Sequence, residues 1–420
     1  MRSEIAAAVV ALVAVGLGSW RHAPLAAQTA PARRVVKITG DTHLLVLWSD
    51  GTVGGWGNYW TGQLGPLANI PGPGLVTRGL VSIELPRPAK DIATGTSSSF
   101  ALLDDGTVMA WGDPRQGQLG IGPVGPAPLL ASSTQAMEYR GIERPRPIVG
   151  LEHVVSIAAG GVSGYAVLDD GTVRAWGGSN IGDDRAPKSY SGPPSRGPAF
   201  LPVPVPGLER VARVSAGSEH VLALTTDGRV LSWGSNFHGA LGRPPRQELP
   251  LDTVGEVPGL TDVTDVAAGL GVSAALKEDG TVWAWGSNLN SQFGFGVRVG
   301  SVGQNHGYDL TPRPVPGVAN VVAIAVGRHG RHTGALLRDG TLRAWGNNDW
   351  GQTGSGGHTG FQAAPITPKI TAVAAVFTAG RSTFAVRTDG SLWAWGGGGP
   401  TEWPLRTNVR VPAPAPPDLK

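Results

Sequence analysis

The sequence predicts an all-β protein, a seven-bladed β-propeller with four-stranded blades. The first observation is a repeat: an Asp-Gly pair, followed six residues after the Asp by a Trp-Gly pair, recurs seven times in the 420 residues. Half of the 14 Trp residues stand at this one repeat position. The 64 Gly and 35 Pro residues also argue against long regular helices. A unit repeated at this length is typical of a propeller or another repeat architecture.

Each repeat contains a tight hairpin. Asp-Gly between two short apolar runs is a strong hairpin signal, because both residues tolerate positive φ. Aliphatic residues flank the turn in every copy, and the residue before the Trp is always Gly, Ala or Ser. Such strands are buried on both faces, as in sheets that stack on each side. The repeated pairs are Asp50-Gly51 with Trp56-Gly57, Asp105-Gly106 with Trp111-Gly112, Asp170-Gly171 with Trp176-Gly177, Asp227-Gly228 with Trp233-Gly234, Asp279-Gly280 with Trp285-Gly286, Asp339-Gly340 with Trp345-Gly346, and Asp389-Gly390 with Trp395-Gly396.

Two further strands complete each blade. A strand that ends in Gly precedes each hairpin, as at residues 155–160, and its Ala and Gly content suits a crowded central axis. A strand marked by Pro and Val follows each long loop, as at residues 146–149, and Pro places it at the outer edge. We therefore expect a propeller over residues 35–411 and a Pro-rich tail over residues 412–420. The pattern leaves open whether the ring closes by pairing strands from both termini or by blade packing alone.

The N-terminus has the layout of a secretory signal peptide. Arg2 precedes an apolar run over residues 5–17, and small residues follow up to Ala27. We expect residues 1–27 to be a signal peptide, with an uncleaved anchor or a tail as the alternative. The run is too short for an ordinary membrane span, so we expect no span in the mature chain. Export without any Cys indicates a secreted or periplasmic bacterial protein that does not use disulfides.

The chemistry that the sequence offers is sparse. The absence of Cys excludes disulfides, thiolate metal sites and cysteine nucleophiles, and no nucleophile elbow, phosphate loop or zinc-protease motif occurs. A net charge of +3 without a basic stripe argues against a nucleic-acid partner. His329-Gly330-Arg331-His332 is either a metal or anion site or a solvated loop, and we favour the loop. The seven turn aspartates are interpreted as structural. We therefore expect no catalytic residue, no metal and no cofactor.

A second pattern follows each repeated Trp. It reads Trp56-Gly57-Asn58-Tyr59-Trp60-Thr61-Gly62-Gln63-Leu64-Gly65 in the first copy and recurs with drift after Trp111, Trp233, Trp285 and Trp345. This signature resembles that of the regulator of chromosome condensation repeat family, a family of seven-bladed propellers. The resemblance implies the propeller fold and, for the eukaryotic founder, guanine-nucleotide exchange on a small GTPase. No residue of this sequence matches an exchange motif.

The repeats also resemble those of a secreted bacterial β-lactamase inhibitory protein with the same fold. That likeness implies binding of a protein by one end of the ring, without chemistry. The corresponding loops here, residues 96–98, 161–163, 270–272 and 381–383, contain no aromatic residue.

Aromatic residues do occur in the signature loops of three blades, and they are the candidate partner-binding residues. The alternative is that they pack over the loops of a neighbouring blade. The long loops over residues 65–86 and 120–145 add variable surface. We predict a non-enzymatic, monomeric exported scaffold that binds an unknown protein, with a GTPase exchange-type regulator as the alternative. The candidates are Tyr59, Trp60, Phe237, His238, Asp349 and Trp350.

Overall fold

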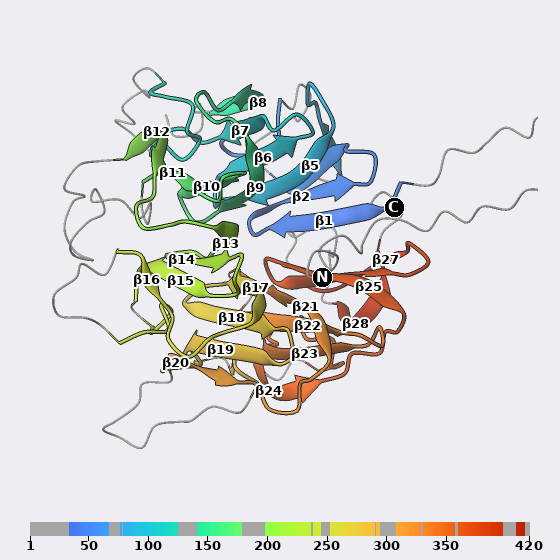
Figure 1. Ribbon diagram of the computed structural model, residues 1–420. Coiled ribbons are helices and arrows are strands. Elements are labelled where there is room, and N and C mark those ends of the chain that lie inside the picture. The colour runs from blue at the N-terminus through green and yellow to red at the C-terminus, as the bar shows by residue number, and fades with distance from the viewer. Residues whose placement is uncertain are drawn as a thin grey trace, which may run out of the picture. The chain divides into compact units, whose positions relative to one another are not determined.

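The computed structural model describes residues 33–66, 76–77, 79–124, 141–178, 198–236, 238–244, 253–289, 291–294, 308–328, 331–357, 360–397 and 409–415. The expected signal peptide lies outside these residues. The described residues form seven antiparallel four-stranded sheets and no helix, which confirms the predicted fold class (Figure 1). The blades are β1–β4 (Val35–Gly40, His43–Trp48, Val53–Gly57, Val81–Ile83), β5–β8 (Ala89–Thr94, Ser98–Leu103, Val108–Gly112, Ile142–Pro147), β9–β12 (Val154–Ala159, Ser163–Leu168, Val173–Gly177, Ala199–Pro204), β13–β16 (Val211–Ala216, His220–Thr225, Val230–Gly234, Gly255–Glu256), β17–β20 (Val263–Ala268, Val272–Lys277, Val282–Ser287, Tyr308–Pro314), β21–β24 (Val321–Val326, His332–Leu337, Leu342–Asn347, Phe361–Ile366) and β25–β28 (Val373–Ala379, Ser382–Arg387, Leu392–Gly396, Val409–Pro414).

The ring closes by packing between complete blades. Each described sheet consists of four strands that are consecutive in the chain, so the first and last blades exchange no described strand. The innermost strands contact one another in succession, and β1 contacts β25 to complete the circle. Figure 1 shows the blue β1 beside the red β25. Trp56 of the first blade meets Phe384 of the last edge-on, with ring centroids 6.2 Å apart. This resolves the question of closure that the sequence left open.

The Asp-Gly hairpins are three-residue loops in which only the Gly has positive φ. In the first blade the Gly51 N–H donates to the Trp48 carbonyl at 2.9 Å, and Gly51 has a φ of 78°. Asp50 has no positive φ, and its Oδ1 accepts bonds from the amide and hydroxyl of Thr52 at 3.0 and 2.6 Å. The turn is thus a type I turn followed by a left-handed Gly, rather than one with two left-handed residues. The Asp side chain therefore stabilises the turn through these two hydrogen bonds.

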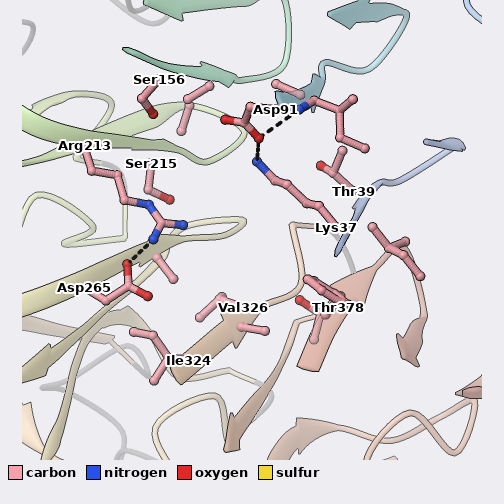
Figure 2. Close-up of a pocket in the computed structure, with 18 of the residues that line it drawn as sticks. Lys37, Thr39, Asp91, Ser156, Arg213, Ser215, Asp265, Ile324, Val326 and Thr378 are labelled. Carbon is pink, nitrogen blue, oxygen red and sulfur yellow. Dashed lines mark hydrogen bonds and ion pairs between the residues drawn. The ribbon is translucent and has the colours of Figure 1, made fainter. Parts of the chain in front are cut away.

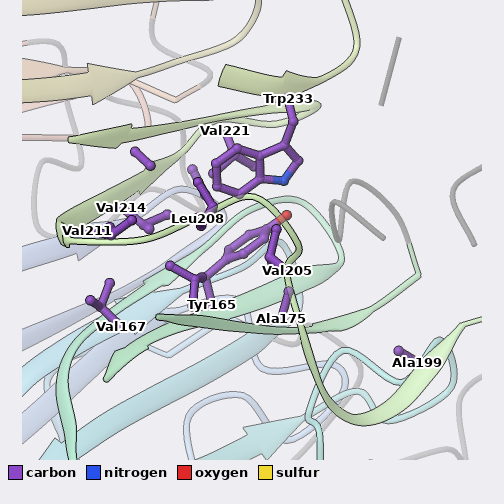
Figure 3. Close-up of a cluster of buried hydrophobic side chains, with 13 residues drawn as sticks. Tyr165, Val167, Ala175, Ala199, Val205, Leu208, Val211, Val214, Val221 and Trp233 are labelled. Carbon is purple, nitrogen blue, oxygen red and sulfur yellow. The ribbon is translucent and has the colours of Figure 1, made fainter. Parts of the chain in front are cut away.

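Apolar side chains fill the space between neighbouring blades. Figure 3 shows one such interface, where Tyr165 of β10 and Trp233 of β15 lie among aliphatic side chains. Their ring centroids are 6.1 Å apart at an interplanar angle of 73°, the edge-on arrangement that aromatic pairs prefer. All seven repeated Trp side chains are among the largest fully buried side chains of the described residues. The core is therefore distributed over the blade interfaces.

The last blade ends slightly later than the sequence indicates. Its outermost strand, β28, is Val409–Pro414, so the propeller includes the first three residues of the segment expected to be a tail. Ala415 remains buried, and its N–H donates to the Leu392 carbonyl at 2.8 Å. Pro is compatible with this strand because β28 is at the outer edge of its sheet.

Candidate functional site

The signature loops emerge at one end of the ring. Each follows the third strand of its blade, and its backbone is tied to the turn between the first two strands. The Asn58 N–H donates to the Thr42 carbonyl at 3.0 Å, and the Asn347 N–H donates to the Arg331 carbonyl at 2.9 Å. Because neighbouring strands run antiparallel, the Asp-Gly turns lie at the opposite end. We call the two ends the signature end and the turn end.

The signature forms a joint between blades. The Gln63 carbonyl accepts a 2.9 Å hydrogen bond from the Trp111 indole of the next blade. The Gln63 side chain accepts the Thr61 N–H at 2.9 Å, which holds the loop in shape, and the adjacent Leu64 is fully buried. Bonds of the same kind, at 2.6–3.0 Å, join Trp176 to Gln118, Trp285 to Ala240, Trp345 to Gln292 and Trp395 to Gln352. The main role of the signature is therefore to hold neighbouring blades together.

A buried histidine strengthens three of these joints. His43 Nε2 lies 2.8 Å from the Ser99 hydroxyl of the next blade, and that hydroxyl donates to the Gln63 carbonyl at 2.8 Å. A hydroxyl has one proton to give, so Nε2 must carry the proton of the neutral ring and donate it. We call this chain a histidine latch. The other two latches are His220–Ser273–Ala240 and His332–Thr383–Gln352.

His43 and His220 are neutral at physiological pH. Burial lowers the pKa of His220 to about 4. Burial also lowers the pKa of His43 to about 4, with Asp41 opposing the shift and Arg328 adding to it. The interpretation of His332 as part of a solvated loop is wrong, because its side chain is buried in the third latch. His329 lies outside the described residues.

The first signature loop carries a strongly exposed indole. Trp60 keeps 60% of its surface, whereas the adjacent Tyr59 is partly buried and packs against the interface of the first two blades. The Trp60 N–H donates to Asn58 Oδ1 at 3.0 Å, so the backbone beneath the exposed ring is fixed. Tyr59 therefore contributes to packing, and Trp60 presents a large apolar surface at the signature end.

The sixth blade carries the second aromatic candidate. Trp350 is partly buried, and the Arg381 guanidinium of the next blade lies 4.5 Å from its ring centroid. Asp349 is exposed and accepts a 2.8 Å bond from the Asn347 amide. This blade therefore presents a carboxylate beside a stacked aromatic–cation pair.

The fourth blade contributes less to the candidate surface. His238 is partly buried, burial lowers its pKa, and it lies against Gly271 of the next blade. Phe237 lies outside the described residues.

Leu289 of the fifth blade, which is 55% exposed, was not among the residues predicted from the sequence. The signal was available, because Leu289 and Trp60 both stand four residues after the repeated Trp.

The carboxylates of the hairpin turns have a structural role. Bonds from the Thr281 side chain and amide lower the pKa of Asp279, and the same arrangement occurs in most of the other turns. Within the described residues, no group of three or more His, Cys, Asp and Glu side chains is placed to hold a metal ion. That part of the chain also contains no helix long and apolar enough to cross a membrane.

The fold and its joints define a repeat propeller of the chromosome-condensation-regulator class. The chain matches the RCC1-like domain over residues 132–415 and the regulator of chromosome condensation (RCC1) repeat over residues 89–118. It belongs to the RCC1-like domain family, as the signature loops indicate.

Two known proteins illustrate the relationship. The chain is 30% identical over 269 residues to the mitochondrial RCC1 domain-containing protein RUG3 of Arabidopsis thaliana, a match covering 61% of this chain and 54% of the relative. It is 25% identical over 376 residues to the human E3 ubiquitin-protein ligase HERC2, covering 75% of this chain and 7% of the ligase. The chain thus spans about half the length of one relative and a small part of the other.

Solved structures support the fold. Prp20p from Saccharomyces cerevisiae has a TM-score of 0.67 at 22% identity, covering 91% of this chain and 87% of that one. Human WBSCR16 has a TM-score of 0.66 at 21% identity, covering 82% and 85%.

Proposed function

We propose that this propeller is a non-enzymatic platform that binds a protein partner through its signature end. The observation that carries the proposal is Trp60, which is 60% exposed on a loop whose backbone is held by hydrogen bonds. An indole on a rigid loop is a typical interface anchor, because it offers a large apolar area while losing little conformational entropy.

The neighbouring chemistry also suits a protein interface. Trp350 with Arg381 adds an aromatic and a guanidinium, two groups enriched at interfaces, and Leu289 adds exposed apolar area. The relatives are consistent with this role: the Prp20p structure is described together with that protein's binding to Gsp1p and histones. For this chain we propose a protein partner of unknown identity, a monomeric state and no role for nucleic acid.

We further propose that residues 1–27 export the chain and that it acts at the cell envelope. The support is the charged start, apolar run and small residues of this segment. Membership of the RCC1-like family favours a second candidate, an exchange-type regulator of a small GTPase. Fractionation of native cells separates the two: a cleaved product outside the cytoplasm favours the exported platform, and an uncleaved cytoplasmic product favours the regulator.

Site-specific crosslinking in native cells tests the platform. A photoreactive amino acid replaces Trp60, Trp350 or, as the control, Val149, which is 70% exposed in the connection between β8 and β9 at the turn end. We expect positions 60 and 350 to crosslink to the same protein and position 149 not to. Equal capture of that protein from position 149 would contradict binding at the signature end.

A further inference from the structure

The innermost strands give the signature end a fixed base. They line a cavity of about 630 Å³ along the axis of the ring, and ion pairs such as Arg213–Asp265, at 2.8 Å, join adjacent blades across its wall (Figure 2). Toward the signature end, Nη2 of Arg328 in the sixth blade donates to the Thr94 and Ala159 carbonyls at 2.6 Å each. Because contacts between blades fix the strands, the placement of a loop residue depends on how its own loop is tied to them.

In the first blade, a continuous path of hydrogen bonds runs from the histidine latch to the exposed indole. The Ser99 hydroxyl accepts from His43 and donates to the Gln63 carbonyl. The Gln63 side-chain amide donates to Asn58 Oδ1 at 3.3 Å, and the same oxygen accepts the Trp60 N–H at 3.0 Å. The latch therefore reaches the backbone of Trp60 through two residues of the loop.

The path is shorter in the sixth blade. The Thr383 hydroxyl accepts from His332 at 2.9 Å and donates to the Gln352 carbonyl at 2.8 Å. The side chain of Gln352 then accepts the Trp350 N–H at 2.9 Å. A single loop residue thus joins the latch to the second candidate indole, so the same arrangement holds both tryptophans.

Two other signature loops each lack one part of this path. In the second blade the Gln118 side chain holds the Gln116 N–H at 2.7 Å, but Ser98 stands at the position of the latch histidine. The joint forms nevertheless, because Trp176 donates to the Gln118 carbonyl at 3.0 Å. In the fourth blade the latch is present, but its carbonyl belongs to Ala240, whose methyl side chain forms no hydrogen bond. The histidine is therefore not required to join blades, and only some latches lead to a candidate anchor.

We propose that His43 and His332 are positioning residues for partner binding. Each holds the backbone beneath an aromatic anchor, Trp60 or Trp350, in the orientation that the partner meets. This inference rests on the proposed platform function. An anchor contributes most to affinity when its loop is ordered before binding, because less conformational entropy is then lost in the complex. Removal of a latch should therefore weaken binding through the loop that this latch holds.

Backbone hydrogen exchange of the purified full chain tests the first step without a partner. His43→Ala removes the latch, and we expect exchange over residues 58–65 to accelerate about tenfold or more. His43→Gln keeps a neutral side-chain N–H donor and should restore most of the protection. His220→Ala is the matched control, because it makes the same change in a latch that holds a different loop. Unchanged exchange over residues 58–65 in His43→Ala would overturn the proposal.

Crosslinking in native cells, with the photoreactive amino acid at position 60, tests the second step. We expect His43→Ala to lower the crosslinking yield about fivefold or more and His220→Ala to leave it unchanged. An undiminished yield in His43→Ala, or equal losses in the two variants, would overturn the positioning role and leave the platform intact. Absence of any crosslink from position 60 when both histidines are present would contradict the platform itself, and this inference with it.

Ser99 provides a second test if His43→Ala folds poorly. Ser99→Ala removes the hydroxyl that links the latch to the loop, whereas Ser99→Thr keeps a hydroxyl, as Thr383 does in the seventh blade. We expect Ser99→Ala to show the faster exchange and the lower crosslinking yield, and Ser99→Thr to stay close to the unmodified chain. Equal behaviour of the two Ser99 variants would overturn the proposal.

Discussion

The blade interfaces and the signature end use the same repeat in opposite ways. In the interfaces, one residue type recurs: every described copy of the repeated Trp is fully buried. Four residues further along the chain, the four blades in which this position is described each present a different exposed residue: Trp60, Arg115, Leu289 and Asp349. A residue that packs between blades meets similar surroundings in every copy, so the same residue type recurs. A surface that recognises a partner needs no such repetition. We therefore assign a role in stability to the recurring positions and a role in binding to the variable position four residues after the Trp.

Truncation of an interface Trp should have the largest effect on stability. Trp111→Ala removes a fully buried indole and its bond to the Gln63 carbonyl. We expect the free energy of unfolding to fall by about 3–5 kcal/mol, measured by denaturant titration. Trp111→Phe should lose less, because most of the ring remains and Ser99 still donates to that carbonyl. Equal losses in the two variants would mean that the hydrogen bond, rather than packing, holds the joint.

The histidine latches predict a loss of stability in acid. The pKa of His220 is about 4 in the folded state, below its ordinary value of 6.5, so only the unfolded chain takes up this proton as the pH falls from 6.5. Stability from this latch is complete above pH 6.5 and is lost as the pH falls toward 4. The His43 and His220 latches should each lose about 2 kcal/mol between pH 7 and pH 5. His220→Gln should lose less stability over that pH range. If the free energy of unfolding of this variant falls with pH as steeply as that of the unmodified chain, the latch is contradicted.

Two glycines with the same backbone angle test the contact between blades at the turn end. Gly280 and Gly259 have φ of 79° and 80°, so an Ala at either position meets similar backbone strain. A Cβ on Gly280 would also lie 3.0 Å from the Cα of Asn320 in the next blade, whereas one on Gly259 would meet nothing within 4 Å. We expect Gly280→Ala to destabilise by about 1 kcal/mol more than Gly259→Ala in thermal or chemical unfolding. Equal effects would show that the hairpin turns move freely against the next blade.

Most of the fold could be predicted because its determinants lie within one repeat. The hairpin turn, the apolar flanks and the Trp are all within a few residues, and each recurs seven times. The latches could not be predicted from the sequence, because His43 and Ser99 are 56 residues apart and meet only when the blades stack. Their signal is a His that begins a second strand, with Ser or Thr one position further in the second strand of the next blade. The role of Arg328 could not be predicted because the carbonyls that it contacts, those of Thr94 and Ala159, belong to blades far from it in sequence.

The site was predictable only to the level of its loops. The repeat position indicated which loops share one end of the ring, but not which side chains the neighbouring blades cover. Tyr59 and His238 pack against adjacent blades, and Trp60 does not. Exposure depends on the residues of the next blade, which have no fixed relation to the loop in sequence.

Removal of the exposed indole should have the smallest effect on stability and a large effect on partner binding. Trp60→Ala deletes a side chain that is 60% exposed, while the hydrogen bond from its backbone to Asn58 remains. We expect the free energy of unfolding to change by no more than about 0.5 kcal/mol. Affinity for the crosslinked partner should fall about thirtyfold, the loss typical of an interface anchor. Trp350→Ala should lower the free energy of unfolding more than Trp60→Ala does and less than Trp111→Ala does. The reason is that it also loses the contact with Arg381 of the next blade. Val149→Ala, at the turn end, should change neither quantity. If Trp60→Ala binds the partner as well as the unmodified chain, the binding surface is not at this position and the contrast between recurring and variable positions does not extend to function.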